Sequence, residues 1–165
     1  MNLPNAETLF ETLAERIKPL IKANTAIVGI HSGGAWLAER LLPILGKDLE
    51  HGILDVSFYR DDFNERGLHS ETKPSQIPFD VQDKHIILID DVFYTGRTIR
   101  AAMNELFDYG RPASITLAVM VNRGGRELPI APQISALDTD LADSKNLQLL
   151  RHKNGTFYFT LEENT

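Results

Sequence analysis

Two adjacent carboxylates, followed by a short hydroxylated turn, are the residues of this sequence best suited to chemistry. Asp90 and Asp91 come directly after the apolar run 86–89, and the turn 95–98 follows with the sequence Thr-Gly-Arg-Thr. A turn that contains glycine and opens a helix presents free backbone N–H groups at the positive end of the helix dipole, so it can bind a phosphate. The carboxylates can accept hydrogen bonds from paired sugar hydroxyls or from the water shell of a metal ion. These parts together predict a site for a phosphorylated ribose.

A second turn of small residues precedes this motif. The apolar stretch 26–30 leads into His31, Ser32, Gly33 and Gly34, and a helical pattern begins at residue 35. Glycine allows the backbone to approach an anion closely, although a turn of this kind is by itself a weak signal. His31 is equally well explained as a binding residue and as a plain polar loop residue.

Strands and helices alternate along the chain up to Tyr109. The pattern predicts helices at 5–22, 35–42 and 99–109, and strands at 26–30, 54–60, 86–89, 114–121, 133–137, 147–150 and 156–161. Asn5 or Thr8 could cap the first helix, and Pro19 should kink it or end it early. Met103 and Phe107 are expected in the core, and Gly110 should stop their helix.

The remaining stretches are predicted to be connections. Residues 61–84 form a long polar segment, and a loop of that length in a compact domain is usually functional or disordered. Asn154 and Gly155 suit a type I′ turn between the last two strands. The alternation implies an α/β fold with a mostly parallel sheet, helices on both faces, and ligands at the carboxyl ends of the strands.

Composition sets limits on the class of protein. The 165 residues predict a single domain, 1–165, and the absence of cysteine excludes disulfides and thiolate chemistry. The N-terminus carries no basic segment with a following apolar run, so we expect a cytoplasmic protein without a membrane partner. A net charge of −6 with dispersed Lys and Arg argues against strong non-specific binding of nucleic acid.

The stretch 86–98 resembles the 5-phosphoribosyl-1-pyrophosphate (PRPP) motif of type I phosphoribosyltransferases. The segments 54–62, 90–102 and 126–130 further resemble the PyrR family, and these matches span most of the chain. The resemblance implies the type I phosphoribosyltransferase fold, with a small hood about residues 122–165 that grips the base and ends in a hairpin. It also implies that 61–84 is a flexible loop closing over PRPP, a step that would exclude water from the reaction centre.

The resemblance assigns roles to individual residues. Those expected to bind the ribose and its phosphate are Asp90, Asp91, Val92, Phe93, Tyr94, Thr95, Gly96, Arg97 and Thr98. Those expected to bind pyrophosphate are His31, Ser32, Gly33 and Gly34, and Arg60, Asp61 and Asp62 are expected at the start of the flexible loop. Mg²⁺ is the implied cofactor, held mainly through PRPP.

Two departures from the PyrR pattern affect the expected site. The pyrophosphate loop usually has arginine where this chain has His31 and Gly33. Pyrophosphate would therefore be neutralised by Mg²⁺, by loop N–H groups or by a residue from elsewhere. The usual Val-Gly-Lys-Asn segment of the hood is replaced by residues 135–138. Asp138 there resembles the Mg²⁺-facing aspartate of hypoxanthine-guanine enzymes, although a loop-capping role explains it more simply.

The resemblance implies a uracil phosphoribosyltransferase that makes UMP and pyrophosphate from uracil and PRPP. Tyr94 is a candidate catalytic residue and favours uracil, because purine enzymes that resemble this chain have aspartate there. A phenol is also a poorer base than a carboxylate at neutral pH. Two alternatives stay open: an RNA-binding regulator of pyrimidine genes with little catalysis, which the charge pattern does not support, and a purine phosphoribosyltransferase. The family resemblance also implies a homo-oligomer.

Overall fold

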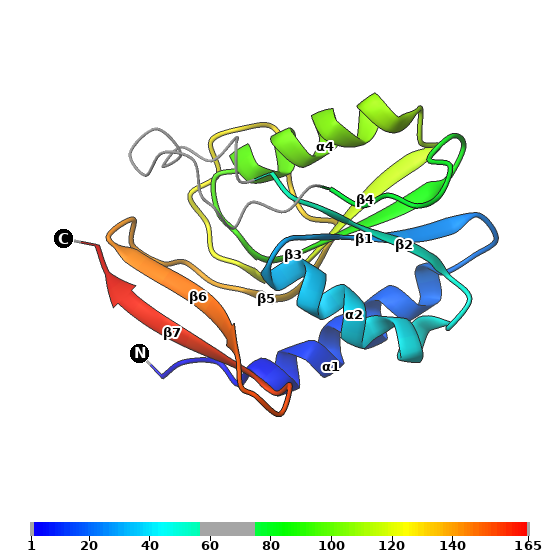
Figure 1. Cartoon of the computed structure of the whole chain (residues 1–165). Helices are drawn as coiled ribbons and strands as arrows, with labels where there is room; N and C mark the ends of the chain where they lie inside the picture. Colours follow the sequence, from blue (N-terminus) through cyan, green and yellow to red (C-terminus); the bar gives the residue numbers. More distant parts are fainter. Residues whose placement is uncertain (1, 57–74, 165) are drawn as a thin grey trace.

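A parallel sheet of five strands forms the centre of the molecule (Figure 1). The computed structural model describes residues 2–56 and 75–164. The strands lie in the order β2-β1-β3-β4-β5, and every neighbouring pair is parallel. Their bounds are Thr25–Ile30 for β1, Glu50–Leu54 for β2, His85–Phe93 for β3, Ser114–Asn122 for β4 and Ile134–Asp138 for β5. The expected α/β fold class is confirmed.

Helices cover both faces of this sheet. Helix α4 (Arg97–Tyr109) lies on one face, and α1 (Ala6–Ile17) and α2 (Gly33–Leu45) lie on the other (Figure 1). Alternate residues of the central strand β3 serve the two cores: Ile87 and Ile89 pack toward α1 and α2, while Ile86 and Leu88 pack on the α4 side. A strand that is buried on both faces has a continuous apolar sequence, as residues 86–89 do. In the described residues, no helix is both long and apolar enough to cross a membrane.

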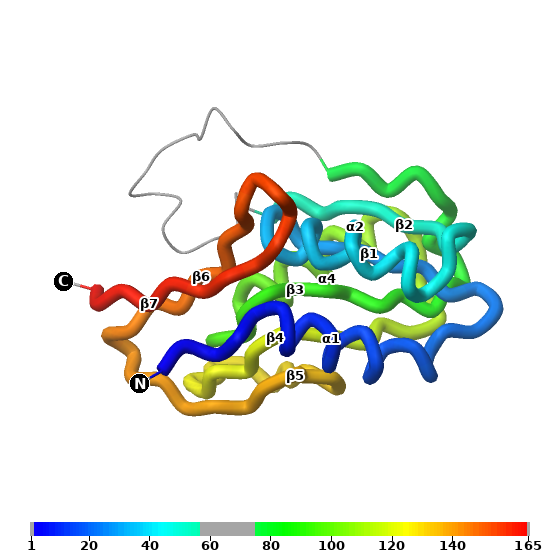
Figure 2. Tube along the Cα trace, turned by 90° about the horizontal axis from the view of Figure 1, so that it is seen from below, coloured from blue at the N-terminus to red at the C-terminus, as the bar shows by residue number. Residues whose placement is uncertain are grey.

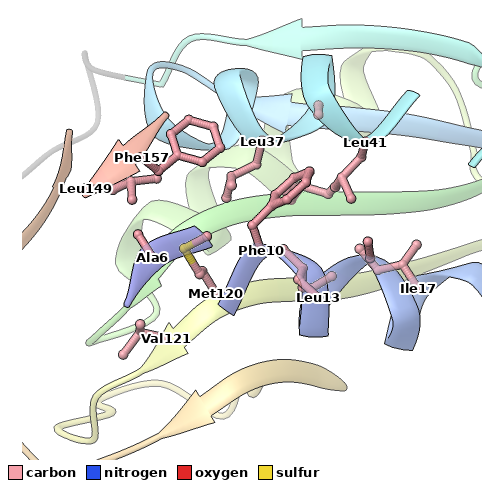
Figure 3. Close-up of a cluster of buried hydrophobic side chains, with 14 of the residues drawn as sticks. Ala6, Phe10, Leu13, Ile17, Leu37, Leu41, Met120, Val121, Leu149 and Phe157 are labelled. Atoms are coloured by element: carbon pink, nitrogen blue, oxygen red, sulfur yellow. The ribbon is translucent and has the colours of Figure 1, made fainter. Parts of the chain in front are cut away.

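An antiparallel hairpin completes the fold. Its strands β6 (Lys145–Arg151) and β7 (Phe157–Glu163) form a sheet of their own. Seen from below (Figure 2), the hairpin lies at the end of the central sheet where β1 and β3 finish. Figure 3 shows Leu149 and Phe157 of the hairpin directed toward Leu37 of α2, in the core that also contains Phe10 of α1. Burial of these side chains holds the hairpin against the main domain.

The first helix ends early, as Pro19 predicted. The side chain of Asn5 accepts a hydrogen bond from the backbone N–H of Thr8 at 3.1 Å, so Asn5 is the N-cap. The α-helix stops at Ile17, and the 3₁₀ helix η1 (Lys18–Leu20) continues it for one turn with Pro19 near its start. A proline in that position loses no necessary donor.

Of the strand expected at 54–60, only residues 54–56 can be compared, because residues 57–60 lie outside the described part of the chain. β2 ends at Leu54, and its residues pair in register with β1 from Ala26↔Glu50 to Ile30↔Leu54. The sequence of β2 shows no apolar alternation. Glu50 and His51 are exposed, and Gly52 lies close to the backbone of Gln76. Pairing with a buried neighbour therefore decides the position of this strand, against the local pattern.

Part of the predicted loop 61–84 can be placed. Residues 61–74 lie outside the described part of the chain. The following segment lies along the edge of the sheet, where Ile53 and Gln76 exchange two backbone hydrogen bonds of 2.8 Å, and Val81 is fully buried.

Phe107 was expected in the core and is 54% exposed. Helix α4 buries Ile99, Ala102 and Leu106, which recur at helical spacing. Phe107 is one residue, or about 100°, further around the helix. The apolar stripe is narrower than the pattern suggested, and Phe107 lies beyond its edge.

Two predictions for the C-terminal third also need correction. The strand expected within the hood is β5, which pairs with β4 and extends the central sheet. The hairpin connection is a three-residue loop rather than a type I′ turn, because Gly155 has a φ of +92° while Asn154 does not have positive φ. His152 and Thr156 face each other, and the Gly155 N–H donates to the His152 carbonyl at 2.9 Å. A turn followed by a left-handed glycine is the usual form of such a loop.

Candidate functional site

A pocket of about 340 Å³ lies between the carboxyl end of β3, the start of α2 and strand β6. The two turns singled out in the sequence follow β1 and β3, which are adjacent parallel strands whose carboxyl ends meet at one edge of the sheet. The turn 31–34 contributes Ser32 and Gly33 to the pocket. The lining residues are Ser32, Gly33, Trp36, Asp90, Asp91, Val92, Tyr94, Arg123 and residues 146–150.

The acidic pair lies on the wall of this pocket. Asp90 is 7% exposed, and its Oδ1 accepts a hydrogen bond from the backbone N–H of Asp91 at 2.9 Å. Oδ1 of Asp91 accepts one from the Val92 N–H at 2.8 Å. Each carboxylate is therefore oriented by its own backbone. Carboxylate oxygens at this position are chemically suited to accept hydrogen bonds from sugar hydroxyls.

The glycine turn packs directly against the acidic pair. A Cβ built on Gly33 would overlap the carboxylate of Asp91, and one built on Gly34 would overlap the backbone carbonyl of Ile89. Only glycine allows this approach. The His31–Ser32 peptide bond is cis, and the Ser32 side chain does not cap α2. The turn and the carboxylates thus form one continuous surface.

The hydroxylated turn 95–98 begins α4, as predicted. Gly96 has a φ of +97°, and the Thr95 Oγ1 accepts a hydrogen bond from the Arg97 N–H at 3.2 Å. The Thr95 carbonyl accepts from the N–H of Glu127 at 2.9 Å, and the Arg97 Nε donates to the Glu127 carboxylate at 3.1 Å. The turn does not line the 340 Å³ pocket but follows it along the chain after Tyr94. The candidate site therefore has two adjoining parts.

Phe93 differs from its neighbours in the motif. Its side chain is 2% exposed and packs in the core on the α4 side. It supports the turn from beneath and cannot present its ring to a ligand, whereas Val92 lines the pocket.

Tyr94 is fixed by residues that the sequence did not single out. Its hydroxyl donates to the Asp143 Oδ1 at 2.7 Å, and the Arg123 guanidinium lies 4.0 Å from its ring centroid. The hydrogen bond to Asp143, with a smaller effect from burial, raises the pKa of the phenol above its ordinary value of 10. The phenol is a neutral donor near pH 7, and this excludes it as a general base there.

Arg123 connects Tyr94 to the hood. It is 3% exposed, and its two terminal nitrogens donate to the carbonyls of Lys145 at 2.7 Å and Ala142 at 2.8 Å. Its Nε has no hydrogen-bond partner within the described residues. The guanidinium therefore holds the segment that leads into β6, and with it one wall of the pocket.

Sequence reasoning missed Arg123, Trp36 and the pocket-facing residues of β6. Arg123 lies three residues before the segment 126–130. A single arginine in a predicted loop gives no indication in the sequence that its side chain is buried. Residues 145–151 show a weak apolar alternation that predicts a strand without showing what it faces.

Asp138, another expected site residue, is not among the described residues that line the pocket. Asp138 ends β5, and its Oδ1 accepts a hydrogen bond at 2.8 Å from the hydroxyl of Ser135 in the same strand. Within the described chain no three His, Cys, Asp or Glu side chains cluster in a way that could hold a metal ion. Arg60, Asp61 and Asp62 lie outside the described residues.

Comparison with known proteins defines the class first. The family model "Phosphoribosyl transferase domain" matches residues 2–146. A purine phosphoribosyltransferase from Pyrococcus horikoshii is 27% identical, with a TM-score of 0.62 over 82% of this chain and 83% of that chain. A hypoxanthine-guanine enzyme from Leishmania tarentolae, 15% identical, has the same fold, with a TM-score of 0.64 over 86% of this chain and 82% of its own. The protein is a phosphoribosyltransferase.

Sequence relatives narrow the class. "Bifunctional protein PyrR" of Nitrosococcus oceani is 49% identical over 160 residues, or 90% of each chain. The protein of the same name from Ralstonia nicotianae is 45% identical and covers 98% of this chain and 96% of its own. Within the phosphoribosyltransferases, the chain belongs to the PyrR family.

Proposed function

We propose that the protein transfers the phosphoribosyl group of PRPP to uracil and releases pyrophosphate. In this reaction a bond forms between N1 of uracil and C1′ of the ribose. The bond from C1′ to the pyrophosphate oxygen breaks with its electron pair, and the N1 proton goes to solvent. The turn 95–98 would hold the 5-phosphate, Asp90 and Asp91 the ribose hydroxyls, and Ser32 and Gly33 the pyrophosphate.

The contact between Gly33 and the Asp91 carboxylate is the observation that carries the proposal. It joins the groups proposed for the ribose and for the pyrophosphate without a gap. The turn 95–98 follows on the other side of Tyr94. One extended ligand with a phosphate at each end and hydroxyls between them matches this order of chemical groups.

Catalysis would be mainly positional. Among the described residues, Tyr94 is not a secure general base, because its phenol is neutral and donates to Asp143. Holding the base in line with C1′ lowers the entropic part of the barrier. The acceptors around the ribose would also fit the electron-poor sugar that forms as pyrophosphate leaves.

Mg²⁺ fits this site as a partner of PRPP rather than as a resident ion. Carboxylates are suitable neighbours for the water shell of Mg²⁺, and two line the pocket as Asp90 and Asp91. The ion would supply charge neutralisation on the pyrophosphate group.

Two observations support the assignment of uracil. The chain belongs to the PyrR family, and position 94 has a neutral phenol where the purine enzymes that resemble this chain have aspartate. Purine transfer is the second candidate, because the 27% identical Pyrococcus protein is a purine phosphoribosyltransferase. A role in RNA-linked regulation is the third.

A panel assay separates these candidates. The protein is incubated with PRPP, Mg²⁺ and each of uracil, hypoxanthine, guanine and xanthine, and nucleotide formation is followed. We expect UMP with the highest kcat/KM. A higher value for hypoxanthine or guanine would reject uracil and keep the PRPP chemistry. Failure with all four bases would leave the regulatory candidate.

A further inference from the structure

The described residues that line the pocket offer the proposed pyrophosphate position few cationic groups. Among the described residues that line it, two are carboxylates, Asp90 and Asp91, and the only cation is Arg123. Both terminal nitrogens of Arg123 already donate to the carbonyls of Lys145 and Ala142. The turn 31–34 offers backbone N–H groups but no arginine or lysine. An additional cation would reduce the cost of holding several negative charges there.

Arg151 lies beside this end of the pocket. It is the last residue of β6, whose residues 146–150 line the pocket. Its guanidinium carbon is 4.8 Å from the ring centroid of Trp36, which is itself a lining residue. Trp36 lies in the first turn of α2 and lines the same pocket as Ser32 and Gly33 of the glycine turn. The ring of Trp36 thus connects the position of Arg151 to the pocket that contains this turn.

The guanidinium is held weakly where it lies. Its ionic partner is Glu39 on the next turn of α2, at 3.7 Å, and the side chains of Arg151 and Glu39 are 38% and 75% exposed. An exposed ion pair of this kind contributes little to stability. The Trp36 ring contributes about as much by its attraction for a cation. Little is lost when the guanidinium moves from Glu39 to a doubly charged phosphate.

We infer that Arg151 is a pyrophosphate-binding residue, which moves along the face of Trp36 and donates hydrogen bonds to the outer phosphate of PRPP. The planar guanidinium can donate two parallel hydrogen bonds to a phosphate. Trp36 keeps the charge near the turn in the absence of ligand. In this way the hood hairpin supplies the cation that the turn 31–34 lacks. The inference rests on the proposed use of PRPP but not on the choice of base.

Three ligands test the inference with the full-length protein and Mg²⁺. PRPP and inorganic pyrophosphate carry the group that Arg151 would bind, and ribose 5-phosphate lacks it. Calorimetry measures each affinity for wild type, Arg151→Gln and Lys153→Gln, the last being an exposed lysine two residues further along the same hairpin. For Arg151→Gln we expect PRPP and pyrophosphate to bind roughly 10- to 100-fold more weakly, and ribose 5-phosphate to change by less than about twofold. Lys153→Gln should bind all three as wild type does.

Tryptophan fluorescence adds a second readout of pyrophosphate binding. Trp36 is the only tryptophan of the chain, so its emission reports on the guanidinium that rests on it. Pyrophosphate should change the emission of wild type and leave that of Arg151→Gln nearly constant. Glu39→Gln removes the competing carboxylate and should bind pyrophosphate at least as tightly as wild type.

Distinct outcomes separate the two levels of the proposal. If wild type binds PRPP, and Arg151→Gln binds both PRPP and pyrophosphate as tightly as wild type does, the inference is wrong and the proposed function stands. If Arg151→Gln loses affinity for ribose 5-phosphate to the same degree, Arg151 supports the fold and is not a pyrophosphate ligand. If wild type binds none of the three ligands, the proposed function and the inference are both rejected.

Discussion

At the scale of single residues, Asp90 and Asp91 present their carboxylates to the pocket while one oxygen of each accepts a neighbouring backbone N–H. Replacing both with asparagine keeps their size and removes two negative charges. We expect turnover of PRPP to fall at least ~100-fold, because asparagine accepts hydrogen bonds from hydroxyls more weakly than a carboxylate does. Steady-state assays with circular dichroism of the variant provide the measurement. A folded double variant that retains near-normal turnover would show that the ribose is bound elsewhere.

Tyr94→Phe isolates the hydroxyl of the candidate catalytic residue. The variant keeps the ring beside Arg123 and loses the hydrogen bond to Asp143. Because the phenol pKa is raised above 10, the side chain stays neutral between pH 6 and 9 in wild type as well. We therefore expect kcat within roughly threefold of wild type and a pH–rate profile of the same shape. Loss of an alkaline or neutral limb in the profile of Tyr94→Phe would mean that the phenol takes part in proton transfer.

At the scale of elements, the close packing of the glycine turn on β3 should be sensitive to one methyl group. Gly34→Ala places a Cβ against the Ile89 carbonyl, and backbone cannot move aside as a side chain could. We expect a loss of about 2–4 kcal/mol in the free energy of unfolding, measured by urea denaturation. Gly155→Ala is a useful control, since that glycine has left-handed φ but open space around it. Its cost should be only the backbone strain, about 1 kcal/mol.

A polar cluster joins the hairpin to α1 and α2. The Glu7 carboxylate accepts two hydrogen bonds from Arg40, at 2.7 and 2.9 Å, and one from the Phe157 N–H at 2.8 Å. The Arg40 guanidinium lies over both the Phe10 and the Phe157 ring, 4.2 and 4.6 Å from their centroids. The cluster therefore ties β7, and through it the pocket wall β6, to the helical layer.

This cluster predicts a pH-dependent contribution to stability. The hydrogen bond from Arg40 is the main cause that lowers the pKa of Glu7 below its ordinary value of 4.5. A lowered pKa means that the stabilisation is complete above about pH 4.5 and is lost as the pH falls through the folded-state pKa. Glu7→Gln should cost about 1 kcal/mol at pH 7, a modest value because the pair is partly open to water. Thermal melts at pH 7 and below pH 4 should show the difference from wild type shrinking in acid.

Glu163→Gln serves as the matched control. Glu163 pairs with Lys145 at the other end of the hairpin, and its side chain is 72% exposed. Its removal should have a smaller effect on stability than that of Glu7 at neutral pH. Equal effects of the two variants would contradict the special role of the Glu7 cluster.

At the scale of the whole molecule, the net charge of −6 bears on the regulatory alternative. Phosphate contacts by clustered Lys and Arg supply most of non-specific RNA affinity and make it fall with salt. We expect no binding of a scrambled RNA below micromolar concentration at about 0.15 M ionic strength, as measured by filter retention. Tight binding with a steep salt dependence would show that the fold or its assembly gathers the dispersed cations into one surface.

The sequence by itself determined the class of fold and the two turns of the candidate site. Each turn lies in one continuous stretch of sequence, 86–98 or 26–34. Each follows a strand that is buried on both faces and therefore has a run of apolar residues. A helix start, a glycine turn and a strand end depend on neighbours within a few residues, so local patterns predict them. The adjacency of the two turns then follows from parallel pairing of β1 and β3.

The tertiary structure alone decided which distant residues complete the site. Tyr94 meets Asp143 across 49 positions, and Arg123 is buried because the hood closes over it. The place of β2 was set by pairing with β1, and that of β5 by pairing with β4. Such choices depend on the combined packing energy of elements far apart in the chain, and local periodicity carries no information about those partners. For that reason the two turns of the candidate site could be predicted from the sequence, whereas the wall formed by β6 could not.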